Sequence, residues 1–116
     1  MPFPGIKIVA PATPADAKLL LKAAIRDPDP VLFLEHKLLY GSKGERPTEG
    51  EPLPRLGTPI VRRRGSEVTI VGLAGTVPIA LAAAEQLQTA NIDGEIIDLR
   101  GLVPLDLTLA EDRECG

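Results

Sequence analysis

The sequence predicts an α/β protein made of two βαβ units. Apolar residues recur at helical spacing over residues 14–26 and again over 76–88. Short runs rich in β-branched residues flank both segments, and the stretch between the two halves, 41–57, has no period of 2 or 3.6. Strand–helix–strand order with nearly continuous apolar strands is typical of a parallel sheet.

The first unit begins with residues 6–10, a β-branched run closed by Pro11. Thr13 is suited to cap a helix that starts at Pro14, where the missing proline N–H costs nothing, and that ends near Arg26. Two groups of side chains are expected to mark its core face and its solvent face, namely Ala17, Leu20, Leu21, Ala24 and Ile25 on one, and Lys18, Lys22 and Arg26 on the other.

The turn Asp27-Pro28-Asp29-Pro30 ends this helix, since each residue before a proline is pushed out of the α region. The apolar run at 31–34 follows without polar alternation, which predicts a parallel strand covered on both faces. His36, the sole histidine, comes just after that strand. A catalytic role is one alternative; a surface or interdomain contact is favoured, because no Ser or Cys motif accompanies it.

Residues 41–57 are rich in glycine, proline and charge, so we expect a linker or long surface loop at a domain boundary. Beyond it, Arg62, Arg63 and Arg64 could form an anion site. Three charges in a chain of net charge -3 instead favour arginines that decorate an exposed strand and turn. The most strongly predicted strand covers residues 67–71.

A glycine-containing turn, Gly72 to Thr76, joins that strand to the second helix, with Thr76 as the expected cap. Such turns can cradle a phosphate, so a small nucleotide-binding α/β domain is an alternative function, and a purely structural or interaction module is a third. Neither GxGxxG nor GxxxxGK[ST] is present. Residues 95–99 complete the second unit, whereas 108–116 show no partner strand or completed helix, as if the chain stopped within a domain.

Composition argues against several classes of protein. A net charge of -3 and only two Phe and one Tyr leave little to bind phosphates or stack on bases, so a nucleic-acid partner is not expected. The longest weakly polar run, 70–84, is too short and too interrupted by Gly and Pro to cross a membrane, and no signal peptide is visible. Cys115 is the only cysteine, which indicates a reducing, cytoplasmic setting.

The end of the first helix has the chemistry of a cation site. Carbonyls from about Lys22 to Ile25 lack partners within the helix, and the Asp27-Pro28-Asp29-Pro30 turn brings further oxygens close. Hard cations prefer such oxygen ligands. From the residues alone, satisfaction of these carbonyls by water and by Arg26 is the favoured alternative.

Several stretches resemble the β subunit of the thiamine-diphosphate-dependent 2-oxo acid dehydrogenases, the pyruvate and acetoin members above all. In collinear order over about 4–106, they are residues 4–18, residues 24–31 with 34–40, and Ile97-Asp98-Leu99-Arg100 with Pro104-Leu105-Asp106. The resemblance implies that 1–40 form the end of a transketolase-like pyrimidine-binding domain, 41–57 a linker, and 58–116 the start of a transketolase C-terminal-like domain, both doubly wound.

The resemblance also implies the parent enzyme's activity, which is oxidative decarboxylation of pyruvate or a related substrate with acyl transfer to lipoamide. Thiamine diphosphate is the implied cofactor, and the implied partners are the E1 α subunit and a second β subunit in a heterotetramer, and the acyltransferase core. In the family, the cofactor-activating glutamate and the active-site histidine lie upstream of the matched segment. We therefore expect this chain to be inactive alone and assign it no catalytic or cofactor-binding residue.

The resemblance implies one metal site. Members of the family can hold potassium on backbone oxygens at the helix end and the following turn, and the matching positions are Ala24, Ile25, Asp27 and Asp29. A further ligand comes from upstream, so the site is expected to be incomplete. Two departures stand out: Gly101, where the family usually has threonine, and residues 107–116, which leave the family pattern.

Overall fold

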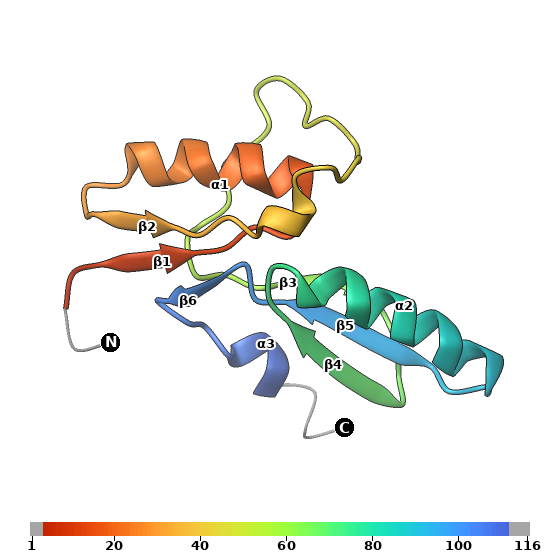
Figure 1. Cartoon of the computed structure of the whole chain (residues 1–116). Coiled ribbons are helices and arrows are strands. Elements are labelled where there is room, and N and C mark those ends of the chain that lie inside the picture. The colour runs from red at the N-terminus through yellow and green to blue at the C-terminus, as the bar shows by residue number, and fades with distance from the viewer. Residues whose placement is uncertain (1–3, 112–116) are drawn as a thin grey trace.

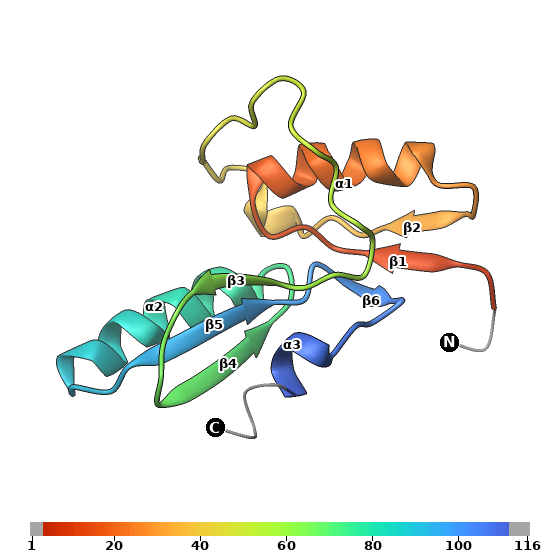
Figure 2. The same ribbon diagram turned by 180° about the vertical axis from the view of Figure 1, so that it is seen from behind.

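A computed structural model describes residues 4–111 of the chain. Two three-stranded sheets each carry one long helix, and they lie one above the other in an elongated molecule of 46 × 32 × 27 Å (Figures 1 and 2). The mixed α/β class predicted from the sequence is confirmed. None of the described helices has the length and apolar character needed to cross a membrane.

The first sheet has the order β2-β1-β6. Its strands are β1 (Lys7–Val9), β2 (Val31–Phe33) and β6 (Gly101–Val103), and α1 (Pro14–Arg26) connects β1 to β2. The predicted βαβ unit is confirmed, because β1 and β2 run parallel with Lys7 opposite Val31. Strand β6 adds an antiparallel neighbour to β1 that the sequence did not predict.

Helix α1 begins and ends where predicted. The Thr13 hydroxyl accepts the N–H of Asp16 at 3.2 Å. The predicted core face is wrong in part: Leu19 and Leu20 are buried, whereas Leu21 is 43% and Ile25 75% exposed. Leucine occupies positions 19, 20 and 21, so two adjacent stripes fit the helical period, and contact with the sheet selects the stripe at 19, 20 and 23.

Strand β2 differs from its prediction. It lies at the edge of the sheet, and Leu32, at 48% exposed, and Leu34, at 41%, are open to solvent on this chain. The apolar run is therefore covered on one face only. Beyond it, a short 3₁₀ helix, η1 (Lys37–Leu39), precedes the irregular segment 41–57, which contains no helix or strand, as expected.

The second sheet has the order β3-β5-β4. Its strands are β3 (Ile60–Arg63), β4 (Val68–Gly72) and β5 (Gly94–Asp98), with α2 (Thr76–Thr89) between β4 and β5. Strands β4 and β5 are parallel, which confirms the second βαβ unit, and β3 pairs with β5 antiparallel. Ala80, Ala84 and Ile96 form the core under α2.

Two local predictions in the second half are wrong. The cap of α2 is Gly75, not Thr76, and Gly75 has no side chain to bond the first turn. The single helical turn α3 (Thr108–Glu111) forms where no helix was expected, starting with the Asp106 carboxylate accepting the N–H of Thr108 at 3.0 Å. Residues 112–116 lie outside the described part of the chain.

The two halves interlock through chain segments as well as side chains. Strand β6, from the second half, completes the first sheet, and Leu56, from the end of the irregular segment, packs with Val9 and Leu20 in the first core. At Gly101, a Cβ atom would lie 2.8 Å from the Ile8 carbonyl oxygen. Glycine at this position therefore permits the close approach of β6 to β1, because a side chain there would force a shift.

Candidate functional site

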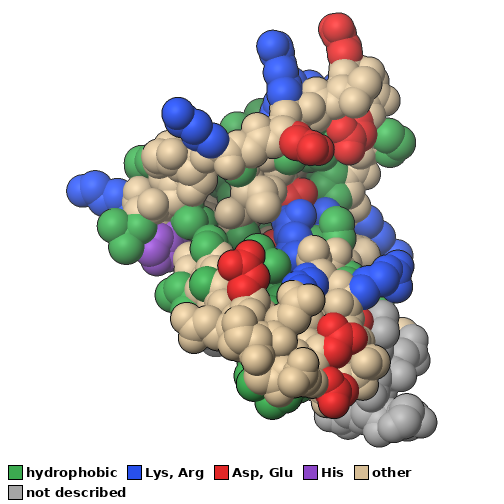
Figure 3. Space-filling model, turned by 90° about the vertical axis from the view of Figure 1, so that its right-hand side faces the viewer, with side chains coloured by type: hydrophobic (Ala, Val, Ile, Leu, Met, Phe, Trp, Pro, Cys, Tyr) green, Lys and Arg blue, Asp and Glu red, His purple; other side chains and the backbone are tan. Residues whose placement is uncertain are grey.

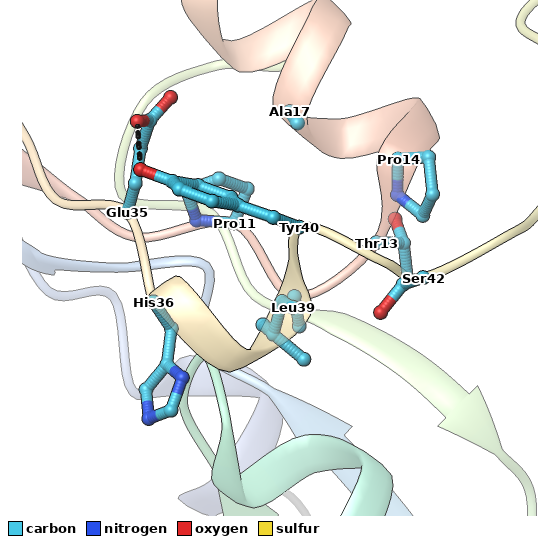
Figure 4. Close-up of a pocket in the computed structure, with 10 residues that line it drawn as sticks. Pro11, Thr13, Pro14, Ala17, Glu35, His36, Leu39, Tyr40 and Ser42 are labelled. Atoms are coloured by element: carbon cyan, nitrogen blue, oxygen red, sulfur yellow. Dashed lines mark hydrogen bonds between the residues drawn. The ribbon is translucent and has the colours of Figure 1, made fainter.

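A pocket of about 280 Å³ lies at the carboxyl ends of β1 and β2, beside the start of α1 (Figure 4). The crevice outside the carboxyl ends of parallel strands is the usual ligand position in open α/β sheets. Its walls are mostly apolar, with Pro11, Pro14, Ala17 and Leu39 among them, and its polar side chains are Thr13, Glu35, His36, Tyr40 and Ser42. Such a lining suits a small apolar group carrying one hydrogen-bond donor or positive charge.

Glu35 and Tyr40 are paired with each other. The Tyr40 hydroxyl donates to Glu35 Oε2 at 2.8 Å (Figure 4). This hydrogen bond, with the charge of the carboxylate, raises the pKa of Tyr40 above its usual value of 10.0. The phenol therefore stays protonated and holds the carboxylate at the mouth of the pocket.

His36 lines the same pocket but points away from Tyr40 toward the start of α2 (Figure 4). A Cβ atom on Gly75 would lie 2.6 Å from the ring nitrogen Nε2 of His36. The histidine of the first unit thus rests against the helix cap of the second. This agrees with the favoured prediction of a surface or interdomain contact.

Four charged side chains connect the two units. Arg62 Nη2 pairs with Asp16, at the start of α1, and with Asp98 Oδ2 at 2.8 Å, at the end of β5. Arg62 Nε also donates to Asp98 Oδ2 at 3.0 Å. Arg100 Nη1 lies 3.4 Å from Asp16 Oδ1, and Arg100 Nε donates to the Thr58 carbonyl at 3.0 Å. We call Asp16, Arg62, Asp98 and Arg100 the interunit ion cluster.

The two carboxylates of this cluster are shielded from solvent, and this changes the pKa of one of them. Asp98 is completely buried and Asp16 nearly so. Desolvation raises the pKa of Asp98 above 3.8, although the hydrogen bond from Arg62 and the N–H of Arg100 both oppose the rise. The cluster is held by charge-assisted hydrogen bonds whose loss would leave a buried carboxyl without its cation.

The arginine prediction is therefore wrong for two of its three residues. Arg62 belongs to the interunit ion cluster. Arg63 bonds the carbonyls of Ala84 at 3.3 Å and Gly94 at 3.0 Å, as well as Gln88 Oε1 at 3.0 Å. Only Arg64 is exposed as expected. Residues distant in sequence supply these partners, so a local pattern of charges could not reveal them.

The side chain of Lys7, on β1, pairs with the acidic residues of the turn after α1. Lys7 Nζ lies 2.8 and 2.9 Å from the two carboxylate oxygens of Asp27 and 3.3 Å from Asp29 Oδ2. The Asp29 N–H donates to Asp27 Oδ1 at 2.9 Å, and the Asp27 N–H donates to the Ala24 carbonyl at 3.3 Å. The hydrogen bond between Lys7 and Asp27 is the main cause that raises the pKa of Lys7 and lowers that of Asp27.

This geometry bears on the potassium prediction. Lys7 neutralises the acidic side chains and one lone pair of Ala24 is used, but the backbone carbonyls of Ile25, Asp27 and Asp29 are compatible with a hard cation. No group of three or more His, Cys, Asp or Glu side chains in residues 4–111 is arranged to hold a metal ion. Arg26, named in the alternative, makes no hydrogen bond or ion pair to this turn in that range. The potassium assignment stays a prediction.

Three backbone N–H groups at the turn 72–76 and the start of α2 are bonded within the turn itself. Leu73 N–H donates to Thr76 Oγ1 at 2.8 Å, Thr76 N–H to the Leu73 carbonyl at 3.1 Å, and Val77 N–H to the Ala74 carbonyl at 3.1 Å. Ala74, not a glycine, takes the left-handed conformation, with φ of 47°. A phosphate cradle uses free N–H groups at the helix start, and the bonds already made by Leu73, Thr76 and Val77 disfavour nucleotide binding here.

Comparisons with known proteins agree with this fold. The family models for the transketolase pyrimidine binding domain and the transketolase C-terminal domain match residues 2–43 and 57–113. A solved split-gene transketolase, described as an inactive β4 tetramer, superimposes with a TM-score of 0.78 at 25% identity, over 97% of this chain and 36% of that one. A transketolase from Pichia stipitis gives 0.65 at 18% identity, over 97% and 16%, which supports the fold alone. The fold and the two matches define a transketolase-like α/β chain.

Among transketolase-like proteins, the chain is similar in sequence to β subunits of dehydrogenases and a related oxidoreductase. The β subunit of 2-oxoisovalerate dehydrogenase from Bacillus subtilis is 50% identical over 104 residues, 89% of this chain and 32% of the relative. The β subunit of the pyruvate dehydrogenase E1 component from Rhizobium meliloti is 47% identical over 90% of this chain and 23% of the relative. The β subunit of acetoin:2,6-dichlorophenolindophenol oxidoreductase from Cupriavidus necator is 49% identical, over 90% and 31%.

The chain therefore belongs to the transketolase family, whose two domain models together match most of it, and over about nine-tenths of its length it is similar to β subunits of 2-oxo acid dehydrogenases, as the resemblance predicted. It spans about a third or less of the length of the relatives it matches.

Proposed function

We propose that this chain is the part of a 2-oxo acid dehydrogenase β subunit that joins the pyrimidine-binding domain to the C-terminal domain. The parent reaction is oxidative decarboxylation of a 2-oxo acid such as pyruvate, with acyl transfer to lipoamide. The observation that carries the proposal is 50% identity in one collinear match over 104 residues that includes both βαβ units. A small independent nucleotide-binding domain is disfavoured because the N–H groups of Leu73, Thr76 and Val77 already bond within the turn.

In this proposal, residues of the chain hold the two domains in a defined relative position. Arg62 ties the first turn of α1 to the end of β5, and His36 seats the loop after β2 on the cap of α2. Both contacts hold the end of one domain against the start of the next. The role of the segment is thus to position the two domains relative to each other.

Thiamine diphosphate, when bound to the whole enzyme, supplies the carbanion chemistry that decarboxylation needs. The pocket at the carboxyl ends of β1 and β2 does not fit the diphosphate, because its main charged group is the Glu35 carboxylate, which would repel phosphate. Dependence on the cofactor is therefore proposed for the whole subunit, and no residue from 4 to 111 is assigned to it.

The proposed partners are those of the parent: an α subunit, a second β subunit and the acyltransferase core. The relatives' names support the first, since each is described as a β subunit. A cytoplasmic location belongs to the same proposal.

A segment exchange tests the function. Residues 4–106 of this chain replace the matching segment in the Bacillus subtilis 2-oxoisovalerate dehydrogenase β subunit, which is produced with its α subunit. We expect an assembled tetramer that decarboxylates 2-oxo acids and reduces a dye acceptor. The matched control carries the segment of the Rhizobium meliloti relative. An inactive tetramer, when the control is active, would contradict the proposal.

A further inference from the structure

A groove of about 820 Å³ lies between α1 and the loop at 46–53 and is separate from the pocket at the strand ends. One wall carries Lys18, Lys22 and Arg26 of α1, and the other carries Arg46. All four side chains are exposed. Figure 3 shows Lys and Arg side chains, together with some Asp and Glu side chains, in the upper part of the molecule, where α1 and this loop lie.

These cations are uncompensated within residues 4–111. None of the four forms an ion pair there, whereas Lys7, Arg62 and Arg100 all do. The groove also contains Glu49 and Glu51, but the Glu51 carboxylate accepts the Thr48 N–H at 3.0 Å and so caps the loop's own turn. Four cations against two carboxylates leave the groove positive on a chain whose net charge is -3.

The spacing of the cations favours an elongated ligand. Lys18, Lys22 and Arg26 follow one another at intervals of four residues, which is about 6 Å along a helix. A single phosphate needs donors that converge on one point, and a linear stripe offers none. In an extended peptide, side chains on alternate residues point the same way and are about 6.7 Å apart. The two spacings nearly coincide.

We propose that this groove binds an extended acidic peptide segment of a partner protein, with carboxylates on alternate residues facing Lys18, Lys22 and Arg26. Arg46 closes the groove from the loop. Single-stranded nucleic acid has a similar charge spacing, but it gains much of its affinity from stacking on aromatic side chains, and the groove is lined by none. The proposal does not depend on the function proposed above.

The test measures fluorescence anisotropy of a labelled peptide of alternating Glu and Ser, at low ionic strength, with the 116-residue chain. Charge screening makes salt a second readout, since binding should weaken steeply between about 0.01 and 0.15 M. We expect Lys22→Glu and Arg46→Glu each to weaken binding about fivefold or more, as exposed ion pairs contribute up to about 1 kcal/mol. Circular dichroism establishes that each variant is folded.

Lys37→Glu is the matched control, because Lys37 is exposed on η1 outside the groove and the change in net charge is the same. It should leave the affinity nearly unchanged. Equal weakening by Lys37→Glu would overturn the proposal by showing general charge attraction. Three other results would also overturn the proposal. They are tighter binding of oligothymidylate than of the peptide, full displacement of the peptide by inorganic phosphate that carries the same total charge, and no binding of the Glu-Ser peptide.

Discussion

Arg62 and Asp16 are 46 residues apart in the sequence, yet their side chains form an ion pair that joins β3 of the second unit to the start of α1 in the first. The same guanidinium reaches Asp98, which is fully buried at the end of β5. One arginine therefore compensates two carboxylates from different units. These charged side chains therefore help to determine how the two units are oriented relative to each other. Because they are buried in a low-dielectric environment, their interactions are stronger than they would be in water.

Replacing Arg62 should destabilise the chain strongly. We expect Arg62→Ala to lower the free energy of unfolding by about 3 kcal/mol, because breaking a buried pair leaves a carboxyl without its cation. Arg64→Ala is the control, since Arg64 is its exposed neighbour and carries the same charge. Urea denaturation at neutral pH measures both variants. Equal stability of the two would show that the ion pair contributes nothing.

In the Arg62→Ala variant, stability should depend on pH over a wider range than in the unaltered chain. Burial already raises the pKa of Asp98 above 3.8, and losing Arg62 removes the main opposing effect. The folded state then binds more protons than the unfolded state between 3.8 and the raised pKa, so stability falls as pH rises through that window. Urea titrations from pH 4 to 7 check this. A variant whose loss of stability is the same at every pH would refute the interpretation.

Gly50 and Gly57 have similar backbone conformations, so replacing each with alanine distinguishes the cost of backbone strain from the cost of a steric clash. Gly57 has a φ of 88° and Gly50 a φ of 80°, both in the left-handed region. A Cβ at Gly57 would lie 2.5 Å from the Pro104 carbonyl oxygen, whereas nothing lies within 4 Å of one at Gly50. We expect Gly50→Ala to cost about 1 kcal/mol and Gly57→Ala about 1–3 kcal/mol more, as measured by thermal unfolding. Similar costs would mean that the close approach at Gly57 relaxes freely.

The sequence was a good guide where local physics decides. Thr13, Pro14 and the Asp27-Pro28 turn mark both ends of α1, and the apolar run of β4 and β5 identifies the second parallel pair. It was a poor guide where distant residues decide. Antiparallel β6 depends on Gly101 meeting Ile8. The buried role of Arg62 depends on Asp16 and Asp98, which no local pattern of charge connects to it.

The turn after α1 should titrate as a pair. The hydrogen bond to Lys7 lowers the pKa of Asp27 below 3.8, so its contribution to stability is present above that value and is lost as pH falls through the folded pKa. Lys7 has a pKa raised above 10.5, and its contribution is lost as pH rises through that folded pKa. In Lys7→Met, the pKa of Asp27 should return toward 3.8, as followed by carbon NMR of the carboxyl. Lys22→Met is the control, because Lys22 forms no ion pair with Asp27, and an unchanged Asp27 pKa in Lys7→Met would contradict the pairing.

Exposed apolar strands should make the isolated 116-residue chain associate. Strands β2 and β4 end their sheets, so their outer edges carry unpaired backbone groups. Apolar side chains on these strands are exposed, with Leu32 at 48% and Val71 at 47%. Burying such a surface against another copy or a partner is favourable, because both apolar area and free edge groups leave water.

Sedimentation velocity at low micromolar concentration should therefore show dimers or larger species. Leu32→Lys and Val71→Lys place a charge on each edge strand, which natural proteins use to block edge-to-edge pairing, and together they should shift the chain toward monomer. Leu38→Lys is the control, because Leu38 is 86% exposed on η1 and belongs to neither edge strand. A single species near 12.3 kDa with a cooperative melt in the unaltered chain would overturn this expectation.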